Sequence, residues 1–333
     1  MKYYKFDELQ NKINQEYYKS NVDIYSDFKT FVDCSKISEA DAIEFYNFIK
    51  KKWNGEEINI YDMGVGNGSY SLNFLKKMEK LDPELTKLIN YRLCDISFRI
   101  SEKNEKGMEK FNVYKQYVDA VANKNFIKNA DYVRSNEMFD DLPSKVYVKK
   151  EDVIFEVYYN EQYERKYVEI ELSKKDKEFM DLMPEGYEIP INTGCLTCML
   201  NVLEGLKKDS YFTFNDYGFI DTYEIMEMGP EFYNMANIRT YGGQPTIDVN
   251  FMYLEYEMKR KGIKSVVENQ RKYVEKILGK KLYYFELDQL DYLEEAEIKT
   301  RKKELEKHGY SVDDVKNGVL EFDDYKYMKI IKN

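Results

Sequence analysis

A glycine-rich turn near residue 65 carries the clearest chemical signal in the chain. A short apolar strand is expected at 58–61, glycines follow at Gly64, Gly66 and Gly68, and a helix is expected from Ser69. Glycine adopts left-handed backbone angles at little steric cost and lets a ligand come close to the bare main chain. The N–H groups that open the following helix suit a carboxylate or a phosphate. The turn therefore predicts a binding site for a small ligand.

The carboxylates around this turn narrow the choice of ligand. A dinucleotide site has the spacing G-x-G-x-x-G and an acid about 20 residues later. Here the third glycine, Gly68, comes one position early, and the next strand-end acid, Asp95, lies 31 positions after Gly64. The pattern D-x-G-x-G-x-G, which begins at Asp62, followed by such an acid is typical of class I methyltransferases. We expect Asp62 to help bind the ammonium of S-adenosylmethionine and Asp95 to accept its ribose hydroxyls.

An acidic turn at 136–143, with the sequence NEMFDDLP, follows the fourth expected strand. Ligands of open α/β sheets bind beyond the carboxyl ends of the strands, where this turn would lie. A guanidinium presents a planar fork that matches a carboxylate, but it is a poor nucleophile because its lone pairs are delocalised. A carboxylate that orients it and helps to remove a proton would favour methyl transfer. Taken alone, the turn is more simply an acidic loop that caps a helix.

Two further loops carry polar residues. Residues 215–218 (NDYG) end another expected strand, and residues 242–251 (GGQPTIDVNF) precede an expected helix. By themselves such loop residues are more often structural than functional. Their interest lies in their combination with the first two motifs.

The composition limits the classes of function. The chain has 333 residues, a net charge of -10 and a charged fraction of 34%. This acidic balance disfavours a bulk nucleic-acid binder, which would have a basic face, and fits a cationic substrate better. A run of about 18 apolar residues and the apolar core of a secretory signal are both lacking, so we expect a soluble protein without a membrane span.

The cysteines favour a reducing compartment over a metal or disulfide framework. Cys195 and Cys198 form a C-x-x-C in an apolar helical run, and the single histidine, His308, lies far away in the sequence. A structural zinc site usually needs four such ligands. We expect two buried thiols on one helical face, no metal, and a cytoplasmic location.

Strands that alternate with helices must position these motifs, and they predict a mainly parallel α/β sheet. The period of two at 145–160 and 163–172 predicts an added β-hairpin or small sheet, the segment 172–190 reads as a polar connector, and 221–250 reads as irregular. Strands are expected at 58–61, 90–97, 114–121, 132–134, 210–219 and 325–331, and helices at 40–53, 69–82, 98–111, 195–208, 250–262, 265–279 and 286–308.

Together the four motifs resemble those of the MidA family, which includes the mitochondrial complex I assembly methyltransferase that modifies protein arginine. The family's E/D-x-G-x-G-x-G motif is matched from Asp62, and its acid and serine after the next strand by Asp95 and Ser97. Its N-E-x-x-D-A-L-P turn is matched at 136–143, with Asp141 in place of the alanine. The remaining matches are the D-Y-G strand end at 216–218, a D-F-x-T element at 27–30, and C-terminal elements at Gln270 and 325–331.

One loop departs from the family pattern G-x-D-I/L-T-x-H-V-D/N-F. Gln244, Pro245 and Asp248 stand where an acid, an aliphatic residue and a histidine are usual. This departure motivates a second hypothesis, an assembly factor that binds S-adenosylmethionine but is catalytically weak or inactive. A third hypothesis, a nicotinamide oxidoreductase, predicts NADH binding, and the early Gly68 and the position of Asp95 speak against it.

The resemblance implies a class I methyltransferase fold, a Rossmann-like and mainly parallel sheet with helices on both faces. We expect an N-terminal helical substrate or cap region (1–57), a methyltransferase core with C-terminal additions (58–144 and 190–333), and an inserted β-rich segment (145–189).

The leading hypothesis is N-methylation of an arginine side chain in a protein or peptide, without metal, nucleic acid or membrane; a homodimer is left open. The residues expected to act are Asp62, Gly64, Gly66, Asn67, Gly68, Asp95 and Ser97 on the cofactor, Asn136, Glu137 and Asp140 on the acceptor guanidinium, and Asp216, Tyr217 and Asp248 on the substrate.

Overall fold

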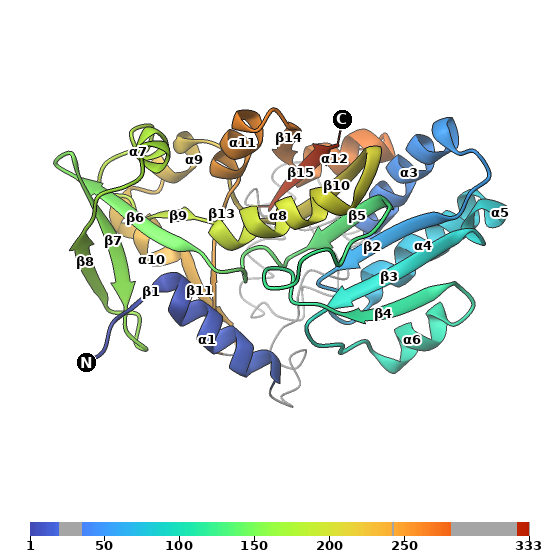
Figure 1. The fold of residues 1–333 in the computed structure, drawn as a ribbon, viewed down its shortest axis with the longest axis horizontal. Helices are drawn as coiled ribbons and strands as arrows, with labels where there is room; N and C mark the ends of the chain where they lie inside the picture. The colour runs from blue at the N-terminus through green and yellow to red at the C-terminus, as the bar shows by residue number, and fades with distance from the viewer. Residues whose placement is uncertain (20–34, 242, 281–324, 333) are drawn as a thin grey trace, which may run out of the picture.

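A computed structural model of the chain describes residues 1–19, 35–241, 243–280 and 325–332 (Figure 1). The D-F-x-T element at 27–30 and the helix expected at 286–308 lie outside these residues. Figure 1 shows an elongated molecule in which the main sheet occupies one end and a smaller sheet the other.

The main sheet has eight strands in the order β14-β15-β10-β5-β2-β3-β4, with β13 beside β10. The neighbouring pairs among β2, β3, β4, β5 and β10 are all parallel. β15 runs antiparallel to both β10 and β14, so the sheet is mixed. The carboxyl ends of the parallel strands therefore share one edge. The strands are β2 (Ile58–Met63), β3 (Ile89–Asp95), β4 (Val113–Tyr117), β5 (Ala130–Asn136), β10 (Leu206–Phe219), β13 (Val249–Asn250), β14 (Lys264–Asn269) and β15 (Tyr325–Ile331).

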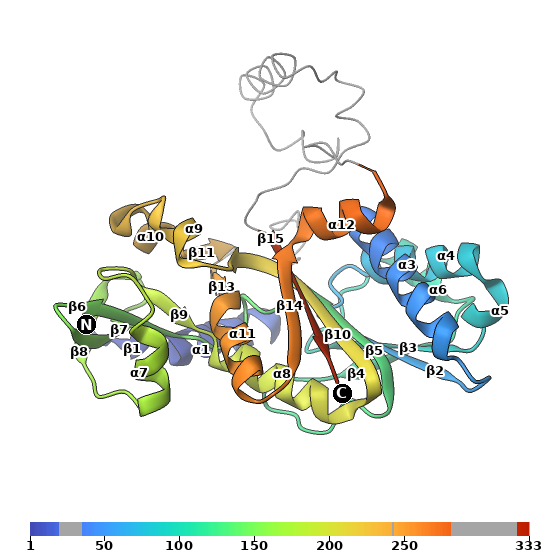
Figure 2. The same cartoon turned by 90° about the horizontal axis from the view of Figure 1, so that it is seen from above.

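Helices cover both faces of this sheet (Figure 2). One face packs against α3 (Ser35–Lys52), α4 (Ser69–Leu81) and α12 (Gln270–Leu278), and the other against α8 (Thr193–Gly205) and α11 (Phe251–Arg260). Central strand β5 is buried along its whole length, as expected for a strand covered on both sides. Within the described residues, no helix is both long and apolar enough to span a bilayer.

Short helices connect or extend these layers. α4 ends before Asp82, whose carboxylate accepts the N–H of Leu85 and so caps the next helix, which begins at Pro83. The shorter helices are α5 (Pro83–Thr86), α6 (Glu102–Met108), α7 (Lys174–Met180), α9 (Thr222–Met226) and α10 (Pro230–Ala236).

The smaller sheet is entirely antiparallel and joins the N-terminus to the segment inserted after β5. Helix α1 (Phe6–Lys19) packs Phe6 and Leu9 against the buried valines of this sheet. A separate hairpin pairs β11 with β12. The strands are β1 (Tyr4–Lys5), β6 (Lys145–Lys150), β7 (Val153–Tyr159), β8 (Arg165–Glu169), β9 (Ile189–Ile191), β11 (Ile238–Tyr241) and β12 (Gln244–Ile247).

Three sequence expectations about these elements are wrong. The segment 265–279 is not one helix, because Lys264–Asn269 forms β14 and the helix begins only at Gln270, capped by Asn269. The segment 221–250 is not irregular but contains α9, α10, β11, β12 and β13, and the expected polar connector contains α7. Phe179 and Met180 of α7 are buried in the core, which fixes that helix.

A buried ion pair links the two central strands. Nη1 of Arg134 in β5 lies 2.9 Å from Oδ1 of Asp62 in β2, and neither side chain is exposed to solvent. The other carboxylate oxygen accepts hydrogen bonds from the hydroxyls of Tyr91 in β3 and Ser71 in α4. The guanidinium carbon lies 3.1 Å from the centre of the Tyr70 ring. Asp62 thus ties β2 to β3, β5 and α4.

We predict that Arg134→Met destabilises the protein by about 3–5 kcal/mol, because it leaves the Asp62 carboxylate buried without a countercharge. Urea unfolding followed by circular dichroism measures the change. The control is Lys87→Met, which removes an exposed ion pair with Glu84 and should cost less than about 1 kcal/mol. Equal small losses in the two variants would contradict the central role of the ion pair.

Candidate functional site

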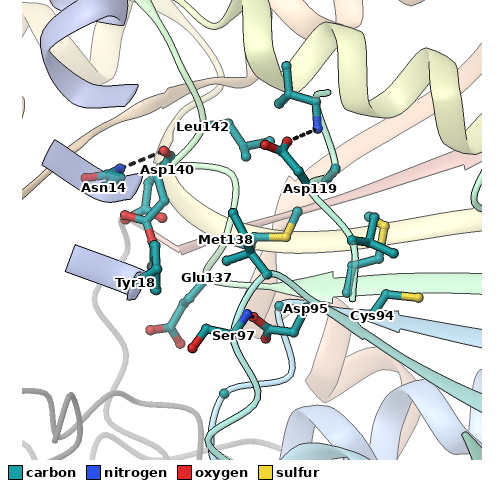
Figure 3. Close-up of a pocket in the computed structure, with 18 of the residues that line it drawn as sticks. Asn14, Tyr18, Cys94, Asp95, Ser97, Asp119, Glu137, Met138, Asp140 and Leu142 are labelled. Carbon is teal, nitrogen blue, oxygen red and sulfur yellow. Dashed lines mark hydrogen bonds between the residues drawn. The ribbon is translucent and has the colours of Figure 1, made fainter. Parts of the chain in front are cut away.

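A cavity of about 460 Å³ lies at the carboxyl-end edge of the parallel strands, beside α1 (Figure 3). This volume is within the usual range for sites of small ligands. The predicted site residues that line it are Gly64, Gly66, Asp95, Ser97, Asn136, Glu137, Asp140 and Tyr217. Those that the structure does not bring to its wall are Asp62, Asn67, Gly68, Asp216 and Asp248.

The glycine turn has left-handed backbone angles at all three predicted positions. The φ angles of Gly64, Gly66 and Gly68 are 68°, 57° and 82°. A Cβ on Gly64 would lie 2.8 Å from the Cβ of Met138, and one on Gly68 would lie 2.8 Å from Cγ2 of Ile100. Gly64 therefore lets the turn pack directly against the acidic turn at 136–143, whereas Gly68 allows close packing beneath the cavity.

Asp95 holds its carboxylate over the glycine turn. Oδ2 accepts the N–H of Val65 at 2.7 Å, and Oδ1 accepts the N–H of Ser97 at 2.9 Å. Burial raises the pKa of Asp95, and hydrogen bonds from these backbone N–H groups oppose that rise. A carboxylate has about four lone-pair sites, so an Asp95 oriented in this way can still accept hydroxyl donors from the cavity.

Asp62 and Asn67 support the turn from outside the cavity. The carboxylate of Asp62 is occupied by the bonds to Arg134, Tyr91 and Ser71 described above. Oδ1 of Asn67 accepts the first N–H of α4, from Ser69. The structure therefore places both residues in the framework beneath the cavity and shows neither of them at its wall.

Asp216 fastens the acidic turn to β10. One oxygen of its carboxylate accepts the backbone N–H groups of Met138, Phe139 and Asp140 at 3.2, 2.7 and 3.2 Å. Asp216 itself is fully buried. Its place in the structure is therefore that of a positioning residue for the turn.

The acidic turn gathers several carboxylates at the cavity, and none of them forms an ion pair among the described residues. Asp140 is only 5% exposed, yet no hydrogen bond or ion pair to its carboxylate is found among the described residues. Burial raises the pKa of Asp140 well above its ordinary value, repulsion by Asp216, Asp141 and Glu137 adds to this rise, and the charge of Arg239 opposes it. Burial likewise raises the pKa of Glu137 to about 7, against hydrogen bonds from Asn136 and Tyr325. A bound cation would relieve this unfavourable arrangement.

Tyr217 and Asp248 are connected through Arg239. Nη1 of Arg239 lies 2.7 Å from Oδ1 of Asp248, and its guanidinium carbon lies 5.0 Å from the centre of the Tyr217 ring. Tyr217 lines the cavity, whereas neither Arg239 nor Asp248 is part of its wall. Asp248 can thus influence a ligand only by way of its neighbours.

Sequence reasoning named none of the residues by which α1 lines the cavity. The Tyr18 hydroxyl donates to Oδ2 of Asp141 and accepts from Nε2 of Gln244 at 2.8 Å. Asn14 donates to the carbonyl oxygen of Asp141. Tyr18 and Gln244 lie 226 positions apart, so no local pattern reveals the contact. The sequence signal lay in Asp141 and Gln244, which both depart from the family motifs.

The loop after β4 forms another part of the wall that was not anticipated. Oδ1 of Asp119 accepts the N–H groups of Val121 and Ala122, which shapes the loop at 118–122. An acid at the end of the third expected strand was the signal available in the sequence.

The comparison with known proteins identifies the family. A family model described as "Putative S-adenosyl-L-methionine-dependent methyltransferase" matches residues 42–231, more than half of the chain. The chain belongs to this methyltransferase family. The assignment agrees with the MidA-like motifs and confirms S-adenosyl-L-methionine as the predicted cofactor. No curated protein matches the chain.

Two solved structures share the fold of this methyltransferase. A COG1565 superfamily member from Burkholderia thailandensis, bound to S-adenosyl-homocysteine, has a TM-score of 0.63 at 13% identity, over 99% of this chain and 88% of that one. A native structure of a COG1565 superfamily protein from the same organism has a TM-score of 0.61 at 14% identity, over 99% and 87% of the two chains.

The residues of the cavity fit the cofactor. Gly64 and Gly66 leave the main chain of the turn accessible, and Asp95 offers a fixed carboxylate beside it. The acidic wall suits a ligand with an ammonium and a sulfonium.

We predict that Gly66→Val weakens binding of S-adenosyl-homocysteine at least about 10-fold, because a branched side chain strains a left-handed position and occupies the cavity. Titration calorimetry measures the affinity. Gly262→Val is the matched control, since Gly262 also has a left-handed φ of 69° but no atom lies within 4 Å of its Cβ position. Unchanged affinity in Gly66→Val would remove this turn from the cofactor site.

Proposed function

We propose that the chain is a class I S-adenosyl-L-methionine-dependent methyltransferase that methylates a nitrogen of an arginine side chain in a protein or peptide. The class I, Rossmann-like interpretation is supported by parallel strands covered on both faces and by a glycine turn between β2 and α4. The acceptor is inferred from the acidic part of the cavity.

The observation that carries the proposal is the buried Asp140 carboxylate without a partner among the described residues, in a cavity already crowded with negative charge. An acceptor that is itself a cation would neutralise it, and a guanidinium can bind a carboxylate through two parallel hydrogen bonds. The basic residue that lines the cavity is Arg99, and the acidic residues that line it are Asp95, Asp119, Glu137, Asp140 and Asp141.

The proposed cofactor turn and the acidic turn lie side by side. Gly64 packs against Met138, so the acidic turn lies directly beside the cofactor turn. Asp140 and Glu137 would orient the acceptor nitrogen toward the methyl group, and Glu137 can accept the proton that this nitrogen loses. When bound, S-adenosyl-L-methionine supplies the methyl group from its sulfonium. The new bond joins nitrogen to carbon as the bond from carbon to sulfur breaks.

We predict that Glu137→Gln keeps the affinity for S-adenosyl-homocysteine but lowers turnover by about 10²–10⁴-fold, the usual contribution of a general base. Mass spectrometry of arginine peptides measures methyl addition, and calorimetry measures the affinity. Glu151→Gln is the control, because Glu151 also has a left-handed φ, 49°, but is exposed in the turn between β6 and β7. Unchanged turnover in Glu137→Gln would exclude Glu137 from the acceptor site.

The pH profile gives an independent test. Because the pKa of Glu137 is raised to about 7, its carboxyl is neutral below that pH and loses its attraction for a cation. We expect kcat/KM to rise with pH through about 7 and the rising limb of kcat to lie at lower pH, since a bound guanidinium lowers this pKa. A flat kcat/KM profile across this range would contradict the proposed role.

A second candidate function is a cofactor-binding assembly factor with little or no activity. The bonds of Gln244 to Tyr18 and of Asp248 to Arg239 favour it, because side chains of the loop that departs from the family pattern are bonded within the protein. Binding of S-adenosyl-homocysteine without any methylated product from arginine proteins would favour this candidate over the first.

A further inference from the structure

Helices α9 and α10 expose a cluster of large apolar side chains outside the cavity. We name this cluster the methionine–aromatic surface; its members and their exposed fractions are Tyr223 (77%), Met226 (52%), Met228 (41%), Phe232 (63%) and Met235 (75%). Single exposed apolar residues are normal on protein surfaces, but a contiguous group marks an interaction site. These five residues fall within thirteen positions of the chain.

The two helices are held so that these side chains point outward. Tyr223 and Met226 are three positions apart on α9, and Phe232 and Met235 are three positions apart on α10, so each pair shares a helix face. Buried Tyr233 anchors α10 by packing against the rings of Tyr187 and Phe219. Figure 2 shows α9 and α10 at the outer edge of the molecule.

The charge around this surface selects the kind of partner. Asp221, Glu227 and Glu231 are exposed among the apolar residues, and residues 221–238 contain no lysine or arginine. The cations recorded at the two helices are already bonded, Arg165 to the carbonyl oxygen of Asn234 and Lys326 to Glu224. The whole chain carries a net charge of -10. A second copy of the chain or an anionic membrane would therefore be repelled, whereas a basic segment would be attracted. Methionine side chains adapt to varied apolar partners, and an amphipathic helix can bind such a surface through its apolar face.

The chain links this surface to the cavity. The segment that carries the surface begins shortly after Tyr217 and ends shortly before Gln244, and both of these residues line the cavity.

We propose that α9 and α10 dock a basic amphipathic segment of the partner protein, with its apolar face on the methionine–aromatic surface and its cations near Asp221, Glu227 and Glu231. That the docked protein also carries the methyl acceptor rests on the proposed function, whereas the docking is independent of it.

The test uses the full chain and a fluorescent synthetic helix of about 20 residues, with leucines on one face and lysines on the other. The probe lacks arginine, so its binding is independent of arginine methylation. Fluorescence anisotropy should give a Kd on the order of 1–10 μM. We expect Phe232→Ser combined with Met235→Ser to weaken binding at least 10-fold, and Glu227→Lys combined with Glu231→Lys to do the same.

Two comparisons make this result specific. Leu182→Ser is the matched control, since Leu182 is 55% exposed but lies outside α9 and α10. The affinity of this variant for the probe should equal that of the wild-type chain. A probe with glutamate in place of lysine should bind at least 10-fold more weakly. Equal binding of the two probes, or of the wild-type and the Phe232→Ser/Met235→Ser chains, would overturn the proposal. So would self-association of the wild-type chain that these serine substitutions abolish.

Methyl transfer is measured separately, on an arginine peptide alone and on the same peptide joined to the basic helix. The Phe232→Ser/Met235→Ser variant should raise KM for the joined peptide at least 10-fold without changing kcat. Both kcat and KM for the short peptide should stay unchanged. If neither peptide is methylated but the probe still binds, the result contradicts arginine methylation and leaves the docking proposal standing. An unchanged KM for the joined peptide would overturn the link between docking and the acceptor.

Discussion

The geometry of the cavity depends on the buried ion pair between Asp62 and Arg134. Each strand that ends at the cavity edge must keep its register, and this pair fixes β2 against β5 while Tyr91 adds β3 and Ser71 adds α4. Two charges removed from water are stable only when they are matched. The framework beneath the glycine turn is therefore specified by chemistry that does not itself touch the ligand.

A second carboxylate performs the same kind of task for the acidic turn. Asp216 gathers three successive N–H groups of the acidic turn and so defines where Asp140 and Glu137 point. Main-chain hydrogen bonds to a charged acceptor are stronger than those between neutral groups. Asp62 and Asp216 thus hold the two walls in place, while Asp95, Glu137 and Asp140 remain at the cavity surface.

The sequence allowed prediction of the features that are local in the chain. The turn at 64–68, the strand end at Asp95 and the acidic turn at 136–143 each carry their pattern in a few consecutive residues. Strand β14 was missed because its pairing with β15 comes from residues near the far end of the chain. Tyr18 was missed for the same reason, since its role exists only once α1 lies beside the acidic turn. The departures at Asp141 and Gln244 were visible, but the bond network that joins them was not.

The two walls of the cavity differ in how the chain builds them. Nearly all of one side comes from one continuous stretch, 63–126, whereas the opposite side is assembled from α1, the acidic turn, the end of β10 and β12. Changes in any of these distant segments would reshape the opposite side of the cavity while leaving the continuous stretch intact. The architecture therefore lets one side of the cavity vary independently of the glycine turn.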